Sequence, residues 1–163
     1  MAQIFISYRR EDSDGEAGAV YRFLEKIFGD GTVFIDFEGF QPGDHFKEAI
    51  LSRLRNSWVC LVIMGPRWLT CRKHLVRRLY LPDDYVRLEI ATAIELNIEL
   101  IPVLVNGAKL PRRHAIPSAI APLLDRNALP LNNQNFNESM ERLVQRIKGL
   151  QSPVGGPVLD PKG

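Results

Sequence analysis

The chain alternates between short apolar runs and longer segments in which apolar residues recur every three or four positions. Short apolar runs rich in β-branched residues predict strands, and the wider spacing predicts amphipathic helices. The predicted strands are residues 4–8, 32–35, 58–64, 100–105 and, more weakly, 127–131. The predicted helices are residues 15–28, 46–55, 84–96 and 137–148.

This alternation predicts an α/β fold with a parallel sheet, because right-handed crossovers place helices on both faces. We expect five strands in the doubly wound, flavodoxin-like order 2-1-3-4-5. The run at 58–64 is apolar throughout, which is typical of a central strand. Asp14 is the predicted N-cap of the first helix and Gly29 its predicted end, and Asp83 or Asp84 should cap the third helix.

Two of the stretches outside these elements are distinctive. Residues 65–82 form a long basic connection, and a loop of this length is usually functional or contains a short element of its own. Residues 152–163 are rich in Pro and Gly and are predicted to be disordered, as a tail or as a linker to a sensor or effector domain. We therefore predict one domain over residues 1–149, followed by this tail or linker over residues 150–163.

The composition narrows the class of protein. A chain of 163 residues with 45% hydrophobic and 25% charged residues is typical of one globular domain. A net charge of +2 is too small to indicate nucleic-acid binding, and no apolar run is long enough to span a membrane. Cys60 and Cys71 form no CxxC pair, so we expect no disulfide framework, no metal site and a cytoplasmic location.

Missing motifs exclude several chemistries of α/β proteins. The turn after the first strand has no GxGxxG, and the chain contains no GxxxxGK[ST] and no GxSxG. A dinucleotide-binding Rossmann site, a P-loop nucleotide hydrolase and a serine hydrolase are therefore not expected. A phosphoacceptor receiver would need an aspartate where the third strand is followed by Gly65, Pro66 and Arg67.

Polar side chains gather where the predicted strands end, which is where ligands bind in open α/β sheets. Tyr85, Glu89 and Thr92 share one face of the third predicted helix, beside its apolar stripe. Glu89 is the carboxylate that this pattern singles out. By spacing alone, a solvated glutamate paired with an arginine is the more common arrangement, so both interpretations stay open.

Short motifs, in order along the chain, resemble the TIR (Toll/interleukin-1 receptor-like) domain over about residues 2–148. FISYRR, which starts at Phe5, resembles the first box of that family. FID, which starts at Phe34, resembles the second box, and QPG at residues 41–43 resembles the loop after it. DDYVRLEI, which ends at Ile90, resembles the NAD-cleaving branch, in which a glutamate follows an aromatic residue by four positions. GPRWL, directly after the third strand, is similar to bacterial members.

The resemblance implies that Glu89 is the catalytic residue of an NAD⁺ nucleosidase or ADP-ribosyl cyclase in bacterial immune signalling, such as antiphage defence. NAD⁺ would be the substrate, with no other cofactor. The resemblance also implies activation by self-association, as a homo-oligomer with TIR–TIR contacts. Tyr85 stands where this branch usually has tryptophan, and it keeps an aromatic surface there.

One carboxylate is enough for this chemistry. Breaking the nicotinamide–ribose bond produces an oxocarbenium-like ribosyl cation, which a carboxylate beside the ribose stabilises. Nicotinamide leaves as a neutral molecule from a cationic pyridinium, so no second carboxyl group is needed to protonate it.

The remaining contacts follow from the groups that NAD⁺ presents, since its pyrophosphate favours arginine forks and its rings favour aromatic faces. The predicted substrate contacts are Ser7, Tyr8, Arg9, Arg10, Asp36, Phe40, Phe46 and Tyr85. The two arginines are equally well explained as surface charges, and Phe46 as a core residue. The predicted loop for gating and assembly consists of Phe37, Glu38, Gly39, Gln41, Pro42, Gly43 and Asp44.

Other functions stay open at this point. A non-catalytic TIR adaptor would act by homotypic binding, and a nucleoside-processing enzyme on a related fold would attack a free nucleoside. Trp68 and the basic residues between 67 and 78 form either a solvated face or a surface that docks a partner.

Overall fold

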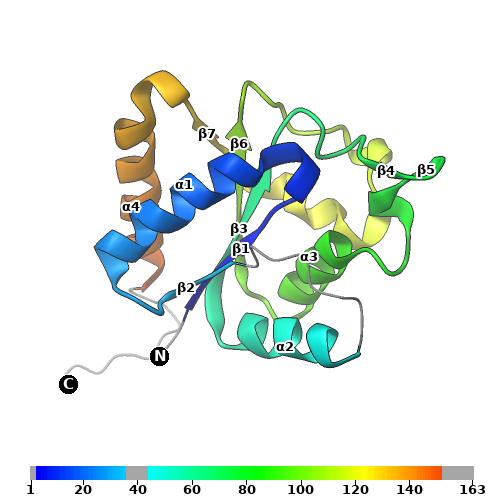
Figure 1. Cartoon of the computed structure of the whole chain (residues 1–163), viewed down its shortest axis with the longest axis horizontal. Coiled ribbons are helices and arrows are strands. Elements are labelled where there is room, and N and C mark those ends of the chain that lie inside the picture. The colour runs from blue at the N-terminus through cyan, green and yellow to red at the C-terminus, as the bar shows by residue number, and fades with distance from the viewer. Residues whose placement is uncertain (1–2, 36–43, 152–163) are drawn as a thin grey trace.

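The computed structural model describes residues 3–35 and 44–151, excluding the side chains of residues 44–46 and 151. Five parallel strands form its main sheet, in the order β2-β1-β3-β6-β7. Their bounds are β1 Gln3–Ser7, β2 Val33–Phe34, β3 Ser57–Met64, β6 Glu99–Val105 and β7 Leu129–Leu131. Counted within this sheet, the order is 2-1-3-4-5, so the predicted flavodoxin-like α/β fold is confirmed (Figure 1).

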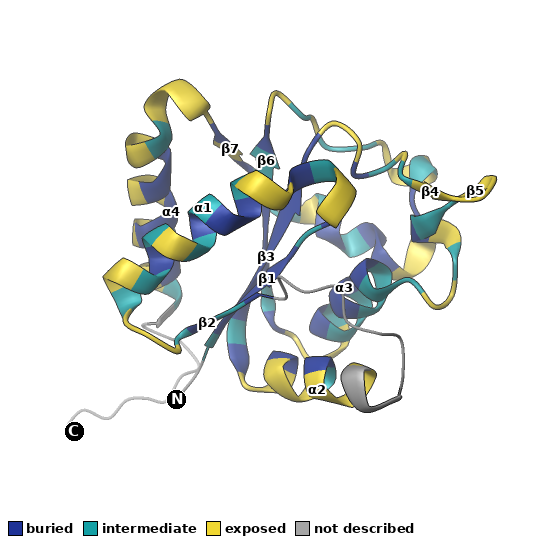
Figure 2. Cartoon of the chain, in the orientation of Figure 1, coloured by how far each residue is buried: buried dark blue, intermediate teal, exposed yellow. Residues whose placement is uncertain are grey.

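Helices cover both faces of the sheet (Figure 1), and the sheet separates the core into two layers. One layer contains α1 (Arg10–Phe28) and α4 (Phe136–Gln151). The other contains α2 (Asp44–Arg55), α3 (Tyr85–Glu95) and the 3-10 helix η3 (Ser118–Asp125). Figure 2 shows β3 buried along nearly its whole length between the layers. Its side chains alternate between them, with Val59, Leu61 and Ile63 in the first and Cys60, Val62 and Met64 in the second.

The first helix begins earlier than the apolar pattern predicts. α1 starts at Arg10, and Ser13 inside it has non-helical angles (φ −148°, ψ 36°), which mark a kink. The backbone N–H of Ser13 donates to the carbonyl oxygen of Arg9, so a helical turn forms directly after β1 without needing an apolar stripe. Asp14 is therefore not the N-cap, whereas Gly29 ends the helix as predicted, with φ 105°.

The basic connection between β3 and α3 contains short elements of its own, as its length predicts. Arg72–Lys73 (β4) and Val76–Arg77 (β5) pair as an antiparallel hairpin, and the 3-10 helix η1 (Arg78–Tyr80) follows. Trp68, before the hairpin, is only 2% exposed and packs in the core with side chains of α2 and α3. The surface interpretations of Trp68 are therefore wrong, because its side chain is part of the buried core.

The remaining elements lie within a few residues of their predicted bounds. Asp84, rather than Asp83, caps α3, because its side chain accepts a hydrogen bond from the backbone N–H of Arg87 at 3.0 Å. Two further 3-10 helices are η2 (Arg113–Ala115) and η4 (Asn133–Asn135). None of the helices in the described ranges combines the length and the apolar character needed to cross a membrane. The predicted tail at 152–163 lies outside the described residues, and the domain bounds stay a prediction.

Candidate active site

A cavity of about 220 Å³ opens where β1 ends, between the first turn of α1 and the start of α3. This is the edge of the sheet at which α/β folds bind ligands. Apolar side chains of β1, β2 and α2 line part of the cavity, and charged side chains of α1, η1 and α3 line the rest. The lining residues are Phe5, Ile6, Tyr8, Arg9, Arg10, Glu11, Phe34, Ile50, Arg78, Asp84, Tyr85, Val86 and Glu89.

Glu89 lies on the inner side of α3, one turn after Tyr85, and both residues line the cavity. Glu89 is 8% exposed. Burial raises the pKa of the Cys60 thiol on β3, and the negative charge of Glu89 raises it further. This burial excludes the solvated glutamate that spacing alone left open.

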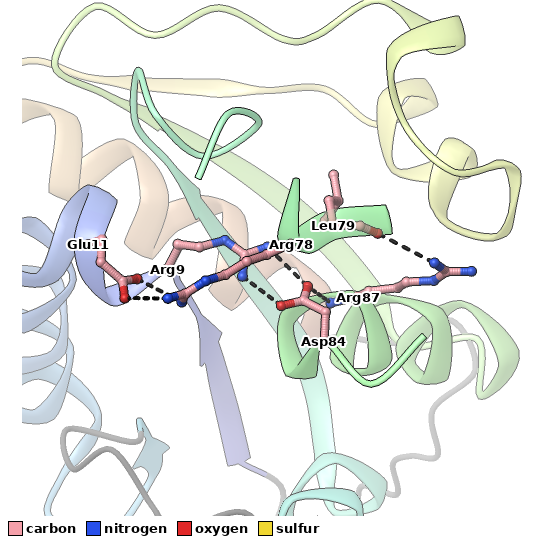
Figure 3. Close-up of polar contacts among 6 residues, drawn as sticks. All are labelled: Arg9, Glu11, Arg78, Leu79, Asp84 and Arg87. Carbon is pink, nitrogen blue, oxygen red and sulfur yellow. Dashed lines mark hydrogen bonds and ion pairs between the residues drawn. The ribbon is translucent and has the colours of Figure 1, made fainter. Parts of the chain in front are cut away.

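A buried ion pair joins the end of β1 to the start of α3 (Figure 3). Arg9 donates from Nη1 to Oδ1 of Asp84 at 2.6 Å and from Nη2 to Oδ2 at 3.0 Å. The two side chains are only 3% and 7% exposed. Because the same carboxylate caps α3, this pair sets the position of the helix that bears Tyr85 and Glu89.

A second ion pair, at the rim of the cavity, is much more accessible (Figure 3). Nη2 of Arg78 lies 2.9 Å from Oε2 of Glu11, and Nη1 donates to Oε1 at 3.0 Å. The side chains of Arg78 and Glu11 are 34% and 46% exposed. Partial burial raises the pKa of Glu11, but its own backbone N–H and the charge of Arg78 lower it more, so the net pKa is below the usual value.

Asp12 connects the first turn of α1 to the loop after β3. Its Oδ2 accepts the backbone N–H of Gly65 and its Oδ1 that of Arg67, both at 2.7 Å. The Arg67 guanidinium also donates to the carbonyl oxygen of Glu11. A Cβ on Gly65 would lie 2.6 Å from Oδ1 of Asp12, so only glycine allows this close approach. The loop that leads to Arg78 is thus fixed against α1.

The structure brings five of the predicted site residues together, and they are Tyr8, Arg9, Arg10, Tyr85 and Glu89. Ser7 is buried and is not among the lining residues, and its hydroxyl has no hydrogen-bond partner among the described residues. Asp44 is the first residue of α2. Asp36, Phe40, the rest of the predicted loop (Phe37, Glu38, Gly39, Gln41, Pro42 and Gly43) and the side chain of Phe46 lie outside the described residues.

Sequence reasoning missed three charged lining residues: Glu11, Arg78 and, beyond its role as a cap, Asp84. Arg78 belongs to the basic run for which the sequence predicts either a solvated face or a docking surface. Arg72, Lys73 and His74 of that run are exposed, whereas Arg78 lines the cavity. The local charge pattern does not distinguish these neighbours. Among the described residues, no group of three or more His, Cys, Asp or Glu could hold a metal ion.

Comparison with known proteins identifies a family. The family model described as "TIR domain" matches residues 4–144 of the chain. No curated protein matches the chain.

Solved structures of TIR domains share the fold. The TIR domains of the activated Roq1 resistosome, which recognises the pathogen effector XopQ, give a TM-score of 0.61 at 11% identity, covering 90% of this chain and 99% of theirs. The TIR domain of the Toll-related receptor TRR-2 from Hydra magnipapillata gives 0.59 at 18% identity, covering 90% and 98%. A TIR-STING receptor from C. gigas, in complex with 2′,3′-cGAMP, gives 0.55 at 19% identity, covering 85% of this chain and 38% of that receptor. At these identities the likeness shows the fold alone.

Proposed function

The chain belongs to the TIR domain family, and we propose that it is an NAD⁺ nucleosidase, with ADP-ribosyl cyclase activity as a variant, that uses Glu89 and acts as a self-associated assembly. The observation that supports this most is the position of Glu89. Its carboxylate is nearly buried, yet it lines a cavity together with an aromatic side chain, Tyr85, and with arginines. Perturbed or buried carboxylates in a cleft are candidates for catalysis.

In the proposed reaction, the bond between C1′ of the ribose and the nicotinamide nitrogen breaks, and its electron pair moves to that nitrogen. Nicotinamide leaves neutral, and positive charge develops on the ribose. The carboxylate of Glu89 stabilises this charge, and the low dielectric of its buried position strengthens the attraction. Water then adds to C1′ and releases a proton, which gives ADP-ribose. Capture by an adenine nitrogen or a ribose hydroxyl would give a cyclic product.

The spacing of Tyr85 and Glu89 suits this substrate. Residues four apart on a helix have Cβ atoms about 5–6 Å from each other. A nicotinamide ring resting on the face of Tyr85 would therefore bring the adjoining ribose next to the carboxylate of Glu89. Tyr8 and Phe34 supply further aromatic surface in the same cavity.

The size of the cavity supports the self-association part of the proposal. Its volume of about 220 Å³ is below the range of about 300–1,000 Å³ that is usual for small-molecule sites. It therefore suits the nicotinamide–ribose half of NAD⁺, and a second copy of the chain would cover the other half. The similar TIR domains of Roq1 belong to an activated resistosome, and we propose that this chain likewise acts within an assembly.

The test measures nicotinamide release from NAD⁺ over a wide range of protein concentration for wild type, Glu89→Gln and Glu95→Gln. Glu95 is a matched control, because it lies on the same helix but is exposed and does not line the cavity. We expect release that rises faster than linearly with wild-type concentration. Loss of one electrostatic contact to a transition state lowers turnover by about 10²–10³-fold, so Glu89→Gln should lose at least that much. Glu95→Gln should match wild type.

Turnover that survives in Glu89→Gln would overturn the mechanism. Turnover of free nicotinamide riboside but not of NAD⁺ would favour a nucleoside-processing enzyme instead.

A non-catalytic adaptor is the second candidate, and an exposed apolar tip on the β4–β5 hairpin favours it. Leu75 is 87% exposed and the adjacent Val76 is also exposed, which suits a protein contact. This function predicts that Pro42→His or Gly43→Ala abolishes a partner complex while Glu89→Gln leaves it intact. It also predicts no release of nicotinamide at any protein concentration.

A further inference from the structure

We infer that Arg78 of η1, rather than Arg9, is the arginine that binds the phosphate groups of the ligand, and that Glu11 occupies its guanidinium until the ligand displaces it. The inference rests on the proposed function for the identity of the ligand, a pyridine dinucleotide. It assigns a binding role to a residue of the connection between β3 and α3, which neither the motifs nor the family match identifies.

The first argument compares the two arginines of the cavity wall that form the ion pairs described above, Arg9 and Arg78. Arg9 uses both terminal nitrogens on Asp84, and the pair is almost completely buried. Releasing Arg9 would leave a buried carboxylate, the one that caps α3, without its cationic partner, so this guanidinium is not available to a ligand. Arg78 holds a carboxylate whose side chain is about half exposed and can rotate into water.

The second argument is the position of the Arg78 guanidinium. Arg78 lines the cavity, and its backbone N–H donates to the carbonyl oxygen of Cys71 at 2.9 Å, which fixes the start of η1. Its Nε is buried and has no hydrogen-bond partner among the described residues. The carboxylate of Glu11 takes both terminal nitrogens in the fork geometry that phosphate oxygens also use (Figure 3).

The third argument is charge. The cavity wall contains three cationic residues, Arg9, Arg10 and Arg78, and three anionic ones, Glu11, Asp84 and Glu89. A wall with no net charge gives no electrostatic preference for the two negative charges of a pyrophosphate. When Glu11 turns away, three cations face two anions and the wall becomes positive. Displacement of Glu11 therefore creates the charge complementarity that the ligand requires.

The experiment measures the binding of inorganic pyrophosphate and of ADP-ribose by isothermal titration calorimetry, so that no catalytic step is involved. The proteins are wild type, Glu11→Gln, Arg78→Gln, the double variant and Arg77→Gln. Arg77 is the matched control, since it precedes Arg78 but does not line the cavity. A lost charge-assisted fork weakens binding about 10-fold or more, which we expect for Arg78→Gln. Arg77→Gln should bind as wild type does.

Glu11→Gln and the double variant separate the inference from simpler explanations. Glu11→Gln should bind pyrophosphate more tightly than wild type, an outcome that misfolding does not produce. If Arg78 only screened Glu11, removing both charges would restore wild-type binding. If Arg78 contacts phosphate, the double variant stays at least about 10-fold weaker than Glu11→Gln. Restored binding in the double variant, or equal binding in Arg78→Gln and wild type, overturns the inference.

Kinetics then distinguish a failure of this inference from a failure of the proposed function. In an active enzyme, Arg78→Gln should raise KM for NAD⁺ and leave kcat nearly unchanged, and it should not affect nicotinamide riboside, which has no phosphate. If the wild-type protein does not turn over NAD⁺, the proposed function is wrong. The pyrophosphate measurements would still decide the role of Arg78. A wild type that binds neither pyrophosphate nor ADP-ribose overturns the inference.

Discussion

Two arginine–carboxylate pairs border the same cavity, and they differ mainly in burial. Arg9 and Asp84 connect β1 to α3 in the interior, whereas Arg78 and Glu11 meet at the rim with a third to a half of each side chain exposed. Both pairs are bidentate, with N–O distances of 2.6 and 3.0 Å in the buried pair and of 3.0 and 2.9 Å in the exposed pair. Chemistry and geometry are therefore alike, and the surrounding dielectric is what separates them.

This difference indicates which pair maintains structure and which responds to a ligand. Breaking a buried pair strands a charge in a low dielectric, so the Arg9–Asp84 pair stays closed and defines the position of Glu89. An exposed pair is worth at most about 1 kcal/mol because water screens it and solvates both partners. The Arg78–Glu11 pair can therefore open for an anion without destabilising the fold.

The largest expected effect is on the buried pair. Asp84→Ala leaves Arg9 uncompensated and removes the cap of α3, so the free energy of unfolding should fall by about 3–5 kcal/mol. Urea denaturation measures this fall. Asp83→Ala is the control, because Asp83 is exposed and does not cap the helix. A loss below about 1 kcal/mol for Asp84→Ala would mean that the buried pair contributes no more to stability than an exposed pair does.

Replacing arginine by lysine compares the pairs directly. Lysine keeps the charge but cannot form the fork, so Arg9→Lys should lower the free energy of unfolding by about 1.5–3 kcal/mol. Arg78→Lys should change it by less than about 1 kcal/mol. Both values come from urea denaturation under one set of conditions. Equal losses for the two variants would show that burial does not separate the pairs.

Gly65→Ala tests the attachment of the loop that leads to Arg78. The added Cβ displaces the Asp12 carboxylate, which holds the backbone N–H groups of Gly65 and Arg67. We expect a loss of about 1–3 kcal/mol in the free energy of unfolding. Gly15→Ala is a suitable control, since a Cβ there meets no atom within 4 Å. A neutral Gly65→Ala would mean that the loop is held by other contacts.

The smallest expected effect is the pH dependence of the exposed pair. The pKa of Glu11 is below its ordinary value of 4.5 in the folded protein, so its ionised form stabilises the fold above that pH. This contribution is lost as the pH falls through the lowered pKa. The difference in stability between wild type and Glu11→Gln should be constant well above pH 4.5 and disappear once the pH is below the lowered pKa of Glu11. Thermal denaturation at a series of pH values measures this difference. A difference that grows as the pH falls would contradict the expected direction.

Part of the candidate site can be predicted from the sequence. Glu89 and Tyr85 share a helix face because four residues make about one turn, and the strand that ends at Ser7 places the following residues at the sheet edge. The cap at Asp84 and the end of α1 at Gly29 also follow from local preferences. The partners of the arginines do not, because Arg9 lies 75 residues from Asp84, and Arg78 lies 67 residues from Glu11.

By itself, the sequence determined the class of fold, the order of the strands and the face of α3 that bears Glu89, because these depend on apolar spacing and on the handedness of crossovers. Only the tertiary structure decided that Trp68 is interior, that α1 begins at Arg10 and that one arginine pair is buried while the other is not. The spacing of apolar residues shows only which side of each helix or strand faces the core. Burial and charge pairing depend on which distant segments meet, and that is settled only when the sheet edge and the loops around it assemble.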